Sequence, residues 1–178
     1  MRMDQRVNPH TEATRATEVF IERWQGLTAS ELATAQSFVI ELCELLSVGK
    51  PHATPDQSYM FERPLKEAHG DGSQSDRRVD CYKRGHFILE AKKLKAGKHT
   101  KGYDNALLAA HAQAQNYARG LPAAEGRPPF IVVVDVGSVI QLFSEFSRSG
   151  GNYVPFPDPR SHQTIKALKA TRASSAPC

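Results

Sequence analysis

Residues 77–92, RRVDCYKRGHFILEAK, constrain the fold of this chain more than any other segment. Short runs that mix apolar and polar side chains flank Lys83–Gly85, and Gly85 suits the left-handed position of a three-residue hairpin loop. The segment therefore predicts two antiparallel strands joined by a tight turn. In this register Tyr82 pairs with His86.

The predicted hairpin places three ionisable side chains on one face of a sheet. Side chains alternate across a strand, so Glu90 and Lys92 share a face with Ile88. Asp80 would pair with Ile88 and lie diagonally from Glu90, with the Cβ atoms roughly 7 Å apart. A two-residue loop would put the two acids on opposite faces, so the prediction requires an odd-length loop or a bulge. The other face, expected to cover a core, carries Phe87, Leu89 and Ala91.

Asp80, Glu90 and Lys92 have the chemistry of a metal-assisted phosphodiesterase. Mg²⁺ takes carboxylate, water and phosphate oxygens as ligands, and Mn²⁺ is an alternative ion. A bound ion would lower the pKa of a water, and the lysine would orient or deprotonate that water and stabilise charge on the phosphate. The alternative is a surface hairpin with solvated charges, because an E-x-K triplet alone is common.

The charge of the chain is concentrated around this hairpin. The formal net charge is +4, but residues 77–101 contain nine Lys/Arg against Asp80 and Glu90, which gives +7 and leaves −3 for the rest. A basic patch around two acids indicates a phosphate-backbone partner such as DNA. For Lys95–Lys101 the alternative is a solvated loop.

The chain is expected to be one cytoplasmic domain without a membrane segment. Its 178 residues suit a single domain with a sizeable core. The N-terminus lacks the apolar stretch of a secretory signal, and the longest apolar run, Phe130–Val134, is far too short to span a membrane. The three cysteines lack zinc-site spacing, and Cys43, among apolar helix residues, is expected to be a buried thiol.

The whole sequence predicts an α/β fold in the broad sense, with a mixed sheet flanked by helices on both faces. Residues 1–14, which include Pro9, are expected to be disordered, 15–146 to form the domain, and 147–178 to form a loop and tail. Apolar spacing predicts helices at 18–24, from Thr28 or Ser30 to about Leu46, and at 105–119. Strands are predicted at 57–63, 130–135 and 139–143, with a Gly/Ser/Asp-rich loop at 67–76.

Two of these elements carry predictions about side-chain direction. On the strand at 57–63, alternation puts Tyr59 and Phe61 on one face and Met60 and Glu62 on the other. Near one face of the helix at 105–119 we expect Leu108, Ala109, Ala112 and Gln115.

Asp80, nine intervening residues and then Glu90-Ala91-Lys92 resemble the active-site motif of the PD-(D/E)XK nuclease superfamily. In the next predicted helix, Gln113 and Tyr117 stand at i, i+4 and so share a face. They resemble the Q-x-x-x-Y element of RecB-like members, which implies a position near the metal site and the nucleic acid. The alternative is a solvated glutamine beside a half-buried tyrosine.

Six segments between about residues 17 and 162 resemble, in order and spacing, the N-terminal nuclease region of MmeI-type restriction–modification enzymes. They are ATAQSFVIELCELLSV, YMFERPL, RRVDCYKRGHFILEAKKL, AQAQNYARGL, PPFIVVVDVGSVIQLF and YVPFPDPRSH. Family members join such a domain through a helical spacer to an adenine-N6 DNA methyltransferase and a target-recognition domain. The resemblance implies a restriction-endonuclease-like core and Mg²⁺-dependent cleavage of DNA.

Residue by residue, the resemblance implies metal binding by Asp80 and Glu90 and catalysis by Lys92. Glu62 is a further candidate ligand, with a structural salt bridge to Arg78 or Arg63 as the alternative. Residues expected to bind DNA or support the site are Gln113, Tyr117, Arg78, Lys93 and Lys95.

The sequence departs from the family pattern after Ser161-His162. It contains no N-P-P-Y/F methyltransferase motif, so we expect no S-adenosylmethionine site and no choice of DNA sequence by this chain. A truncated remnant with the start of a spacer, a split subunit with a methyltransferase or target-recognition partner, and an excised domain all remain open. Double-strand cutting would favour a dimer on DNA. Rival functions are a catalytically silent DNA-binding or scaffolding module and a structure-selective nuclease on the same fold.

Overall fold

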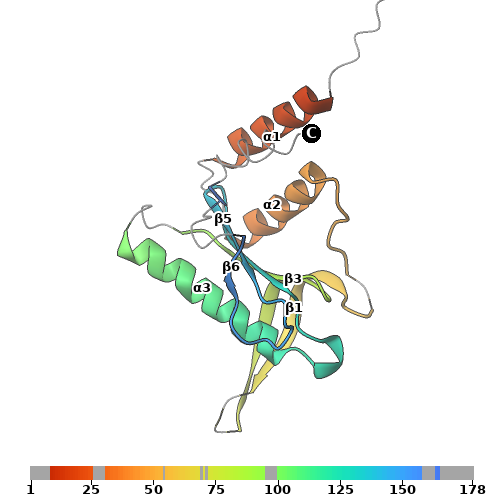
Figure 1. Ribbon diagram of the computed structural model, residues 1–178, viewed down its shortest axis with the longest axis vertical. Helices are drawn as coiled ribbons and strands as arrows, with labels where there is room; N and C mark the ends of the chain where they lie inside the picture. Colours follow the sequence, from red (N-terminus) through yellow and green to blue (C-terminus); the bar gives the residue numbers. More distant parts are fainter. Residues whose placement is uncertain are drawn as a thin grey trace, which may run out of the picture.

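The computed structural model describes residues 9–25, 31–53, 55–68, 70, 72–94, 100–157 and 163–164. Helices pack on both faces of one mixed β-sheet (Figure 1), which confirms the predicted fold class. The helices are α1 (Pro9–Trp24), α2 (Glu31–Leu45), α3 (Lys101–Gly120) and a 3₁₀ turn at Ala123–Glu125. The strands are β1 (Tyr59–Ala68), β2 (Gln74–Lys83), β3 (Phe87–Lys92), β4 (Phe130–Asp135), β5 (Val139–Ser144), β6 (Val154–Pro155) and β7 (Gln163–Thr164).

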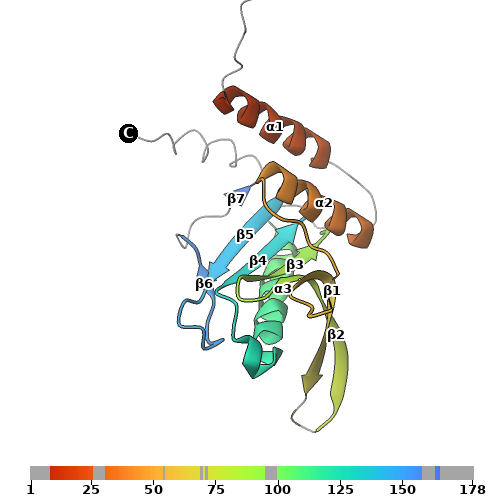
Figure 2. The same ribbon diagram turned by 90° about the vertical axis from the view of Figure 1, so that its right-hand side faces the viewer.

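The sheet has the strand order β1-β2-β3-β4-β5-β6, with β7 paired to β5. Neighbouring strands are antiparallel except β3 and β4, which are parallel. A parallel pair needs a long crossover, and α3 supplies it between β3 and β4. The hairpin strands β2 and β3 therefore lie between the edge strand β1 and the central strand β4 (Figure 2).

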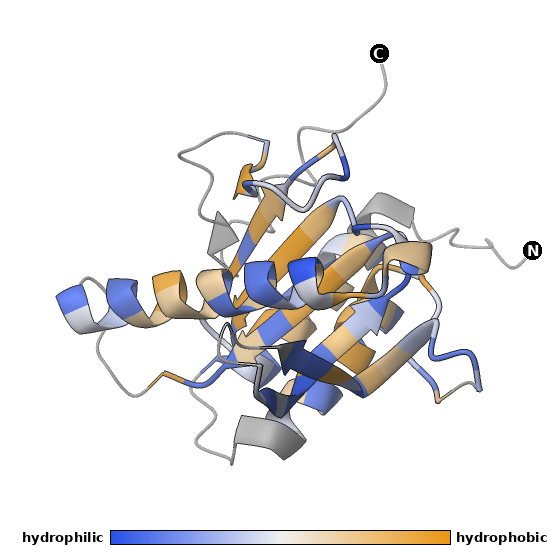
Figure 3. Cartoon of the chain, turned by 90° about the horizontal axis from the view of Figure 1, so that it is seen from below, coloured by the Kyte–Doolittle hydropathy of each residue, from blue (hydrophilic) through white to orange (hydrophobic). Residues whose placement is uncertain are grey.

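Two hydrophobic cores lie on opposite faces of the sheet. Tyr103, Leu107 and other residues of α3 pack on one face, together with Ile88 and Ile131 of the sheet. The other face is covered by α1 and α2, and α2 lies between α1 and the sheet (Figures 1 and 2). Strand β4 contributes to both cores, which confirms its prediction as a strand buried on both sides, and the central strands are strongly hydrophobic in Figure 3.

Helix α1 begins at Pro9, nine residues before the predicted start at Glu18, so residues 9–14 are helical rather than disordered. Proline is tolerated in the first turn of a helix, where its missing N–H has no helical partner to lose. Residues 1–8 and the proposed caps Thr28 and Ser30 lie outside the described residues. Helix α2 matches its prediction closely, and Cys43 is buried as expected.

Helix α3 begins four residues earlier than predicted because Thr100 caps it. The Thr100 hydroxyl accepts a hydrogen bond from the backbone N–H of Tyr103 (3.2 Å). The face predicted to carry Leu108, Ala109 and Ala112 points to solvent, since Leu108 is 65% exposed and the two alanines are exposed too. The side chains that face the sheet are Tyr103, Leu107, Ala110, Ala114, Tyr117 and Ala118.

The β1–β2 hairpin is longer than predicted, because β1 continues to Ala68 and β2 begins at Gln74. Pro64 fits within β1 because this strand lies at the edge of the sheet, where a missing N–H breaks no ladder on the open side. The hairpin projects beyond the body of the molecule (Figure 2). Short strands β6 and β7 occupy part of the segment after Ser147 that was predicted as loop. None of the helices in the described part of the chain combines the length and apolarity needed to cross a membrane.

Candidate active site

The β2–β3 loop has the predicted odd length but lies one residue later than predicted. Tyr82 pairs with Ile88, not with His86, and Lys83 pairs with Phe87. Gly85, with φ of 69°, occupies the middle of the turn rather than its end, so β2 extends to Lys83 and β3 begins at Phe87. The backbone N–H of His86 donates to the carbonyl of Lys83 (3.0 Å) and closes the loop.

This register changes the relation between the two acids. Continued by one residue, it places Asp80 directly opposite Glu90, so the predicted pairing of Asp80 with Ile88 was wrong. The Asp80 carboxylate accepts a hydrogen bond from the backbone N–H of Ala91 (2.7 Å). Asp80 is therefore held against β3 beside Glu90, and directly opposed residues have closer Cβ atoms than a diagonal pair.

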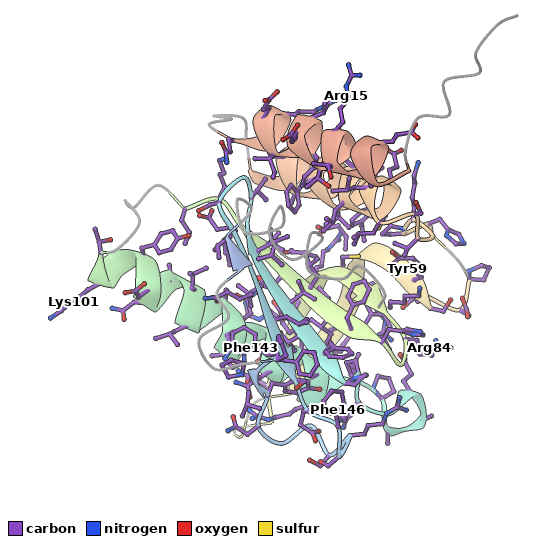
Figure 4. The ribbon with its side chains drawn as sticks, turned by 45° about the horizontal axis from the view of Figure 1, so that its top comes forward. Arg15, Tyr59, Arg84, Lys101, Phe143 and Phe146 are labelled. Atoms are coloured by element: carbon purple, nitrogen blue, oxygen red, sulfur yellow. The ribbon has the colours of Figure 1, made fainter. Side chains whose placement is uncertain are left out.

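Glu90 and Lys92 form an ion pair at the end of β3. Lys92 Nζ lies 2.7 Å from Glu90 Oε1, with side-chain exposures of 27% for the lysine and 1% for the glutamate. A buried carboxylate needs a charge partner, and Lys92 supplies it while keeping part of its surface accessible. Arg84, in the β2–β3 turn, and Lys101, at the start of α3, lie on opposite sides of the molecule (Figure 4). Strand β3 leads from the side of Arg84 towards the side of Lys101.

A cavity of about 180 Å³ opens beside these residues, between α2 and the sheet. Its polar lining consists of Asp80, Lys92, Glu62 and Gln36, and its apolar lining of Ala35, Val39, Phe61, Cys81, Leu89 and Ala91. Asp80 and Lys92 of the hairpin therefore border a partly apolar space that can admit solvent and a ligand, and the buried Glu90 contacts it through its ion pair with Lys92.

Glu62 lies on β1 across from Asp80, between the pairs Phe61–Cys81 and Arg63–Val79. Its φ of 51° interrupts the alternation of the strand, and both Phe61 and Glu62 line the cavity. Burial raises the pKa of Glu62, the charge of Asp80 raises it further, and Arg78 opposes both. Glu62 thus lies within electrostatic range of Asp80.

The predicted alternative of a salt bridge between Glu62 and Arg63 is wrong, because Arg63 pairs with Glu125. Arg63 Nη2 lies 2.5 Å from Glu125 Oε1, and the Tyr82 hydroxyl donates to the other oxygen of Glu125 (2.6 Å). The guanidinium also stacks over the Tyr82 ring at 4.3 Å. This buried network fixes β1 and β2 on the α3 face, two residues along β2 from Asp80.

Helix α3 carries Gln113 and Tyr117, whose side chains are hydrogen-bonded to each other. Gln113 Nε2 donates to the Tyr117 hydroxyl (2.6 Å), and Tyr117 is buried rather than half-buried. Burial raises the pKa of Tyr117, the bond from Gln113 lowers it, and the charges of Glu90 and Asp80 raise it. The hydroxyl therefore lies within electrostatic range of both acids, on the face opposite α2.

Lys93 and Asp135 brace the chain after Lys92. Lys93 Nζ donates to the carbonyl of Val136 (3.0 Å), which links the chain after β3 to the chain after β4. Asp135, which the sequence reasoning did not single out, accepts from the backbone N–H of Leu94 (3.0 Å) and from the Tyr103 hydroxyl (3.0 Å). The sequence signal that could have identified Asp135 is an acid at the end of a buried strand. Arg78 is exposed, and Lys95 lies outside the described residues.

The donor set suits a hard divalent cation more than a transition metal. Across the described ranges there is no group of three or more His, Cys, Asp or Glu placed to hold one ion. Two neighbouring carboxylates beside an open space are instead the arrangement that Mg²⁺ uses when water and phosphate oxygens complete its shell. Asp80, which lines the cavity, and Glu90, which lies opposite it on β3, would supply the carboxylate oxygens of such a shell.

Comparison with known proteins gives one match. The family model described as MmeI, N-terminal domain matches residues 12–173, which is most of the chain and includes the whole site. No curated protein and no solved structure matched. The chain therefore belongs to the family of MmeI N-terminal domains.

Proposed function

We propose that this chain is the Mg²⁺-dependent DNA endonuclease module of a restriction–modification system. Family membership relates the chain to restriction–modification enzymes. The observation that carries the proposed activity is the juxtaposition of Asp80 and Glu90 on adjacent strands, with Lys92 Nζ 2.7 Å from Glu90 beside the cavity. Carboxylates and a lysine in this order are the reason to assign the site to the PD-(D/E)XK type.

In this proposal Asp80 and Glu90 hold Mg²⁺, with Glu62 as a further candidate ligand and Mn²⁺ as a substitute ion. The bound ion would lower the pKa of a water and stabilise charge on the phosphate oxygens. The bond from Ala91 N–H orients the Asp80 carboxylate, and Lys92 orients the Glu90 carboxylate. Residues of β3 therefore hold each carboxylate in position before the reaction begins.

Lys92 has a second role in the proposal. Its ammonium carries three donors, and its exposed fraction allows contact with a phosphate at the cavity. There it would orient the attacking water and stabilise the negative charge that develops on the phosphate. Gln113 and Tyr117 would support the acid pair from the α3 face, and Arg78 would contribute positive charge for the DNA backbone.

Cleavage of supercoiled plasmid by the full chain tests this function. With Mg²⁺, the wild type should convert the plasmid to nicked or linear forms, and Asp80→Asn and Lys92→Met should each lower the rate on the order of 100-fold or more. The exposed ion pair between Lys66 and Asp76 provides matched controls. Lys66→Met and Asp76→Asn remove the same charges away from the cavity and should stay within about threefold of wild type.

Equal rates for wild type and both site variants would contradict the proposal. Salt-dependent DNA binding without Mg²⁺-dependent cleavage would identify the chain as a silent DNA-binding or scaffolding module. Faster cleavage of branched or single-stranded DNA than of linear duplex would identify a structure-selective nuclease. A partner carrying methyltransferase or target-recognition functions, and a dimer on DNA, are further proposals that size measurements on the DNA complex would test.

A further inference from the structure

The cavity beside the hairpin contains few groups that can donate a hydrogen bond. Ionised Glu62 and Asp80 only accept, and the buried Cys81 thiol is a weak donor. Among the described side chains that line the cavity, the N–H donors belong to Lys92 and Gln36. Lys92 already directs one donor to Glu90.

A phosphodiester bound in this cavity would face an excess of acceptors. Its two non-bridging oxygens carry the negative charge, which grows in the transition state, and the carboxylates of Glu62 and Asp80 repel it. Beside the Mg²⁺ of the proposed function, hydrogen-bond donors would help to hold the phosphate in a productive position. Lys92 directs one of its three donors to Glu90, so a donor from a second residue would add a separate contact to one non-bridging oxygen.

Gln36 is placed to supply that donor from the opposite wall. It lies on α2 with Ala35 and Val39, and all three line the cavity across from Asp80 and Lys92. Ala35 and Val39 are buried and fix this face of the helix against the sheet, whereas Gln36 is only half-buried. In the described part of the chain, the Gln36 amide makes no side-chain hydrogen bond that would compete for its N–H groups.

We propose that Gln36 is a substrate-binding residue of the nuclease site, and that its amide N–H donates to one non-bridging oxygen of the scissile phosphate. This inference rests on the proposed nuclease function. A neutral amide suits the position, because it supplies a donor without forming a competing ion pair with Glu62 or Asp80. The bond strengthens as charge grows on the oxygen, so its main effect falls on the cleavage step rather than on DNA affinity.

Stereodefined phosphorothioate DNA tests the contact. The full chain is assayed on three linear duplexes of one sequence, with oxygen, uniformly Rp or uniformly Sp linkages. On the oxygen duplex, Gln36→Met should slow single-turnover cleavage on the order of 10- to 100-fold. Because sulfur is a poor acceptor, the ratio of wild-type to Gln36→Met rates should fall to within about threefold of unity for one diastereomer and persist for the other. Because both proteins are measured on the same duplex, the general effect of sulfur on the cleavage rate cancels in this ratio.

Further variants separate a phosphate contact from a structural role. Gln36→Glu keeps the shape but replaces the donor with a negative charge, so it should be slower than Gln36→Met. Gln36→His restores an N–H donor and should recover part of the rate. Ser37→Ala changes the adjacent exposed residue and should behave as wild type. DNA affinity measured in Ca²⁺ should change less than about threefold in Gln36→Met.

A rate ratio that is the same on all three duplexes would show that Gln36 acts through the fold and would overturn the proposal. A Gln36→Met rate equal to wild type on oxygen DNA would also overturn it. Both outcomes leave the nuclease assignment intact as long as Asp80→Asn abolishes cleavage. Absence of cleavage by the wild type, or full activity of Asp80→Asn, would overturn the nuclease assignment and this inference together.

Discussion

His111 projects from α3 onto Phe143 of β5, and their rings stack with centroids 3.9 Å apart. Burial is the largest influence on this imidazole and lowers its pKa, while a backbone hydrogen bond involving Tyr153 acts in the opposite direction. The folded protein therefore favours neutral His111, and protonation opposes the stacked arrangement. This side chain couples the packing of α3 on β5 to pH.

The pKa shift of His111 predicts how stability depends on pH. The unfolded chain takes up the proton near the ordinary histidine pKa, about 6.5, and the folded chain only at lower pH. The stability that neutral His111 contributes is thus present above about pH 6.5 and lost as the pH falls towards the folded-state pKa. Urea unfolding at pH 7 and pH 5 should show a larger loss for wild type than for His111→Phe, which keeps the stack. The same pH dependence in both proteins would contradict this assignment.

The elements that the sequence predicts best are those whose pattern is local. Strand β4 matches its predicted range because the apolar run Phe130–Val134, bounded by Pro129 and Gly137, strongly favours a buried strand. Strand β5 and helix α2 also match closely. The hairpin was predicted with the right parity and the wrong register, because Gly85 can take either the middle or the last position of a three-residue loop.

Features that depend on packing between distant elements could not be predicted. The face of α3 that packs on the sheet is set by contacts that begin at Tyr103. The helix has several alanines on different sides, so the sequence alone does not show which of them face the sheet. Gln36 and Asp135 were missed for the same reason, since their neighbours come from other strands and helices. The acids and Lys92 were found because their spacing on one hairpin already carries the chemistry.

The β4–β5 turn is fixed against α1 by Gly137. Its φ of 79° is left-handed, and an added Cβ would collide with the backbone carbonyl oxygen of Trp24. Gly85 has a similar φ of 69° but open space around it. Both glycines therefore require a left-handed backbone, but of the two only Gly137 has the backbone of another element close to its Cα.

This difference gives a stability prediction. Gly85→Ala should cost about 1–2 kcal/mol of unfolding free energy from backbone strain alone. Gly137→Ala should cost the same strain plus displacement of α1, and so exceed Gly85→Ala by at least about 1 kcal/mol. Urea denaturation of both variants measures the two costs. Equal losses would show that the approach of α1 to this turn contributes no stability.

The architecture of the whole molecule explains why the candidate site lies where it does. One sheet separates two cores, with α3 on one face and α1 and α2 on the other. Lys92 and Asp80 of the hairpin line the cavity between α2 and the sheet. Glu90 is buried and lies within electrostatic range of Tyr117 on the α3 face. The acid pair is therefore supported from both layers. The match to the MmeI N-terminal domain family spans this entire arrangement.

A crystal structure of the full chain soaked in Mn²⁺ tests the central claim most directly. Anomalous difference maps should show Mn²⁺ bound by both Asp80 and Glu90, with the Gln113–Tyr117 pair on the α3 side. The peak should be absent from Asp80→Ala crystals treated in the same way. Maps without a peak at the acid pair, or with the peak unchanged in Asp80→Ala, would contradict the assignment of these residues as the metal centre of a nuclease.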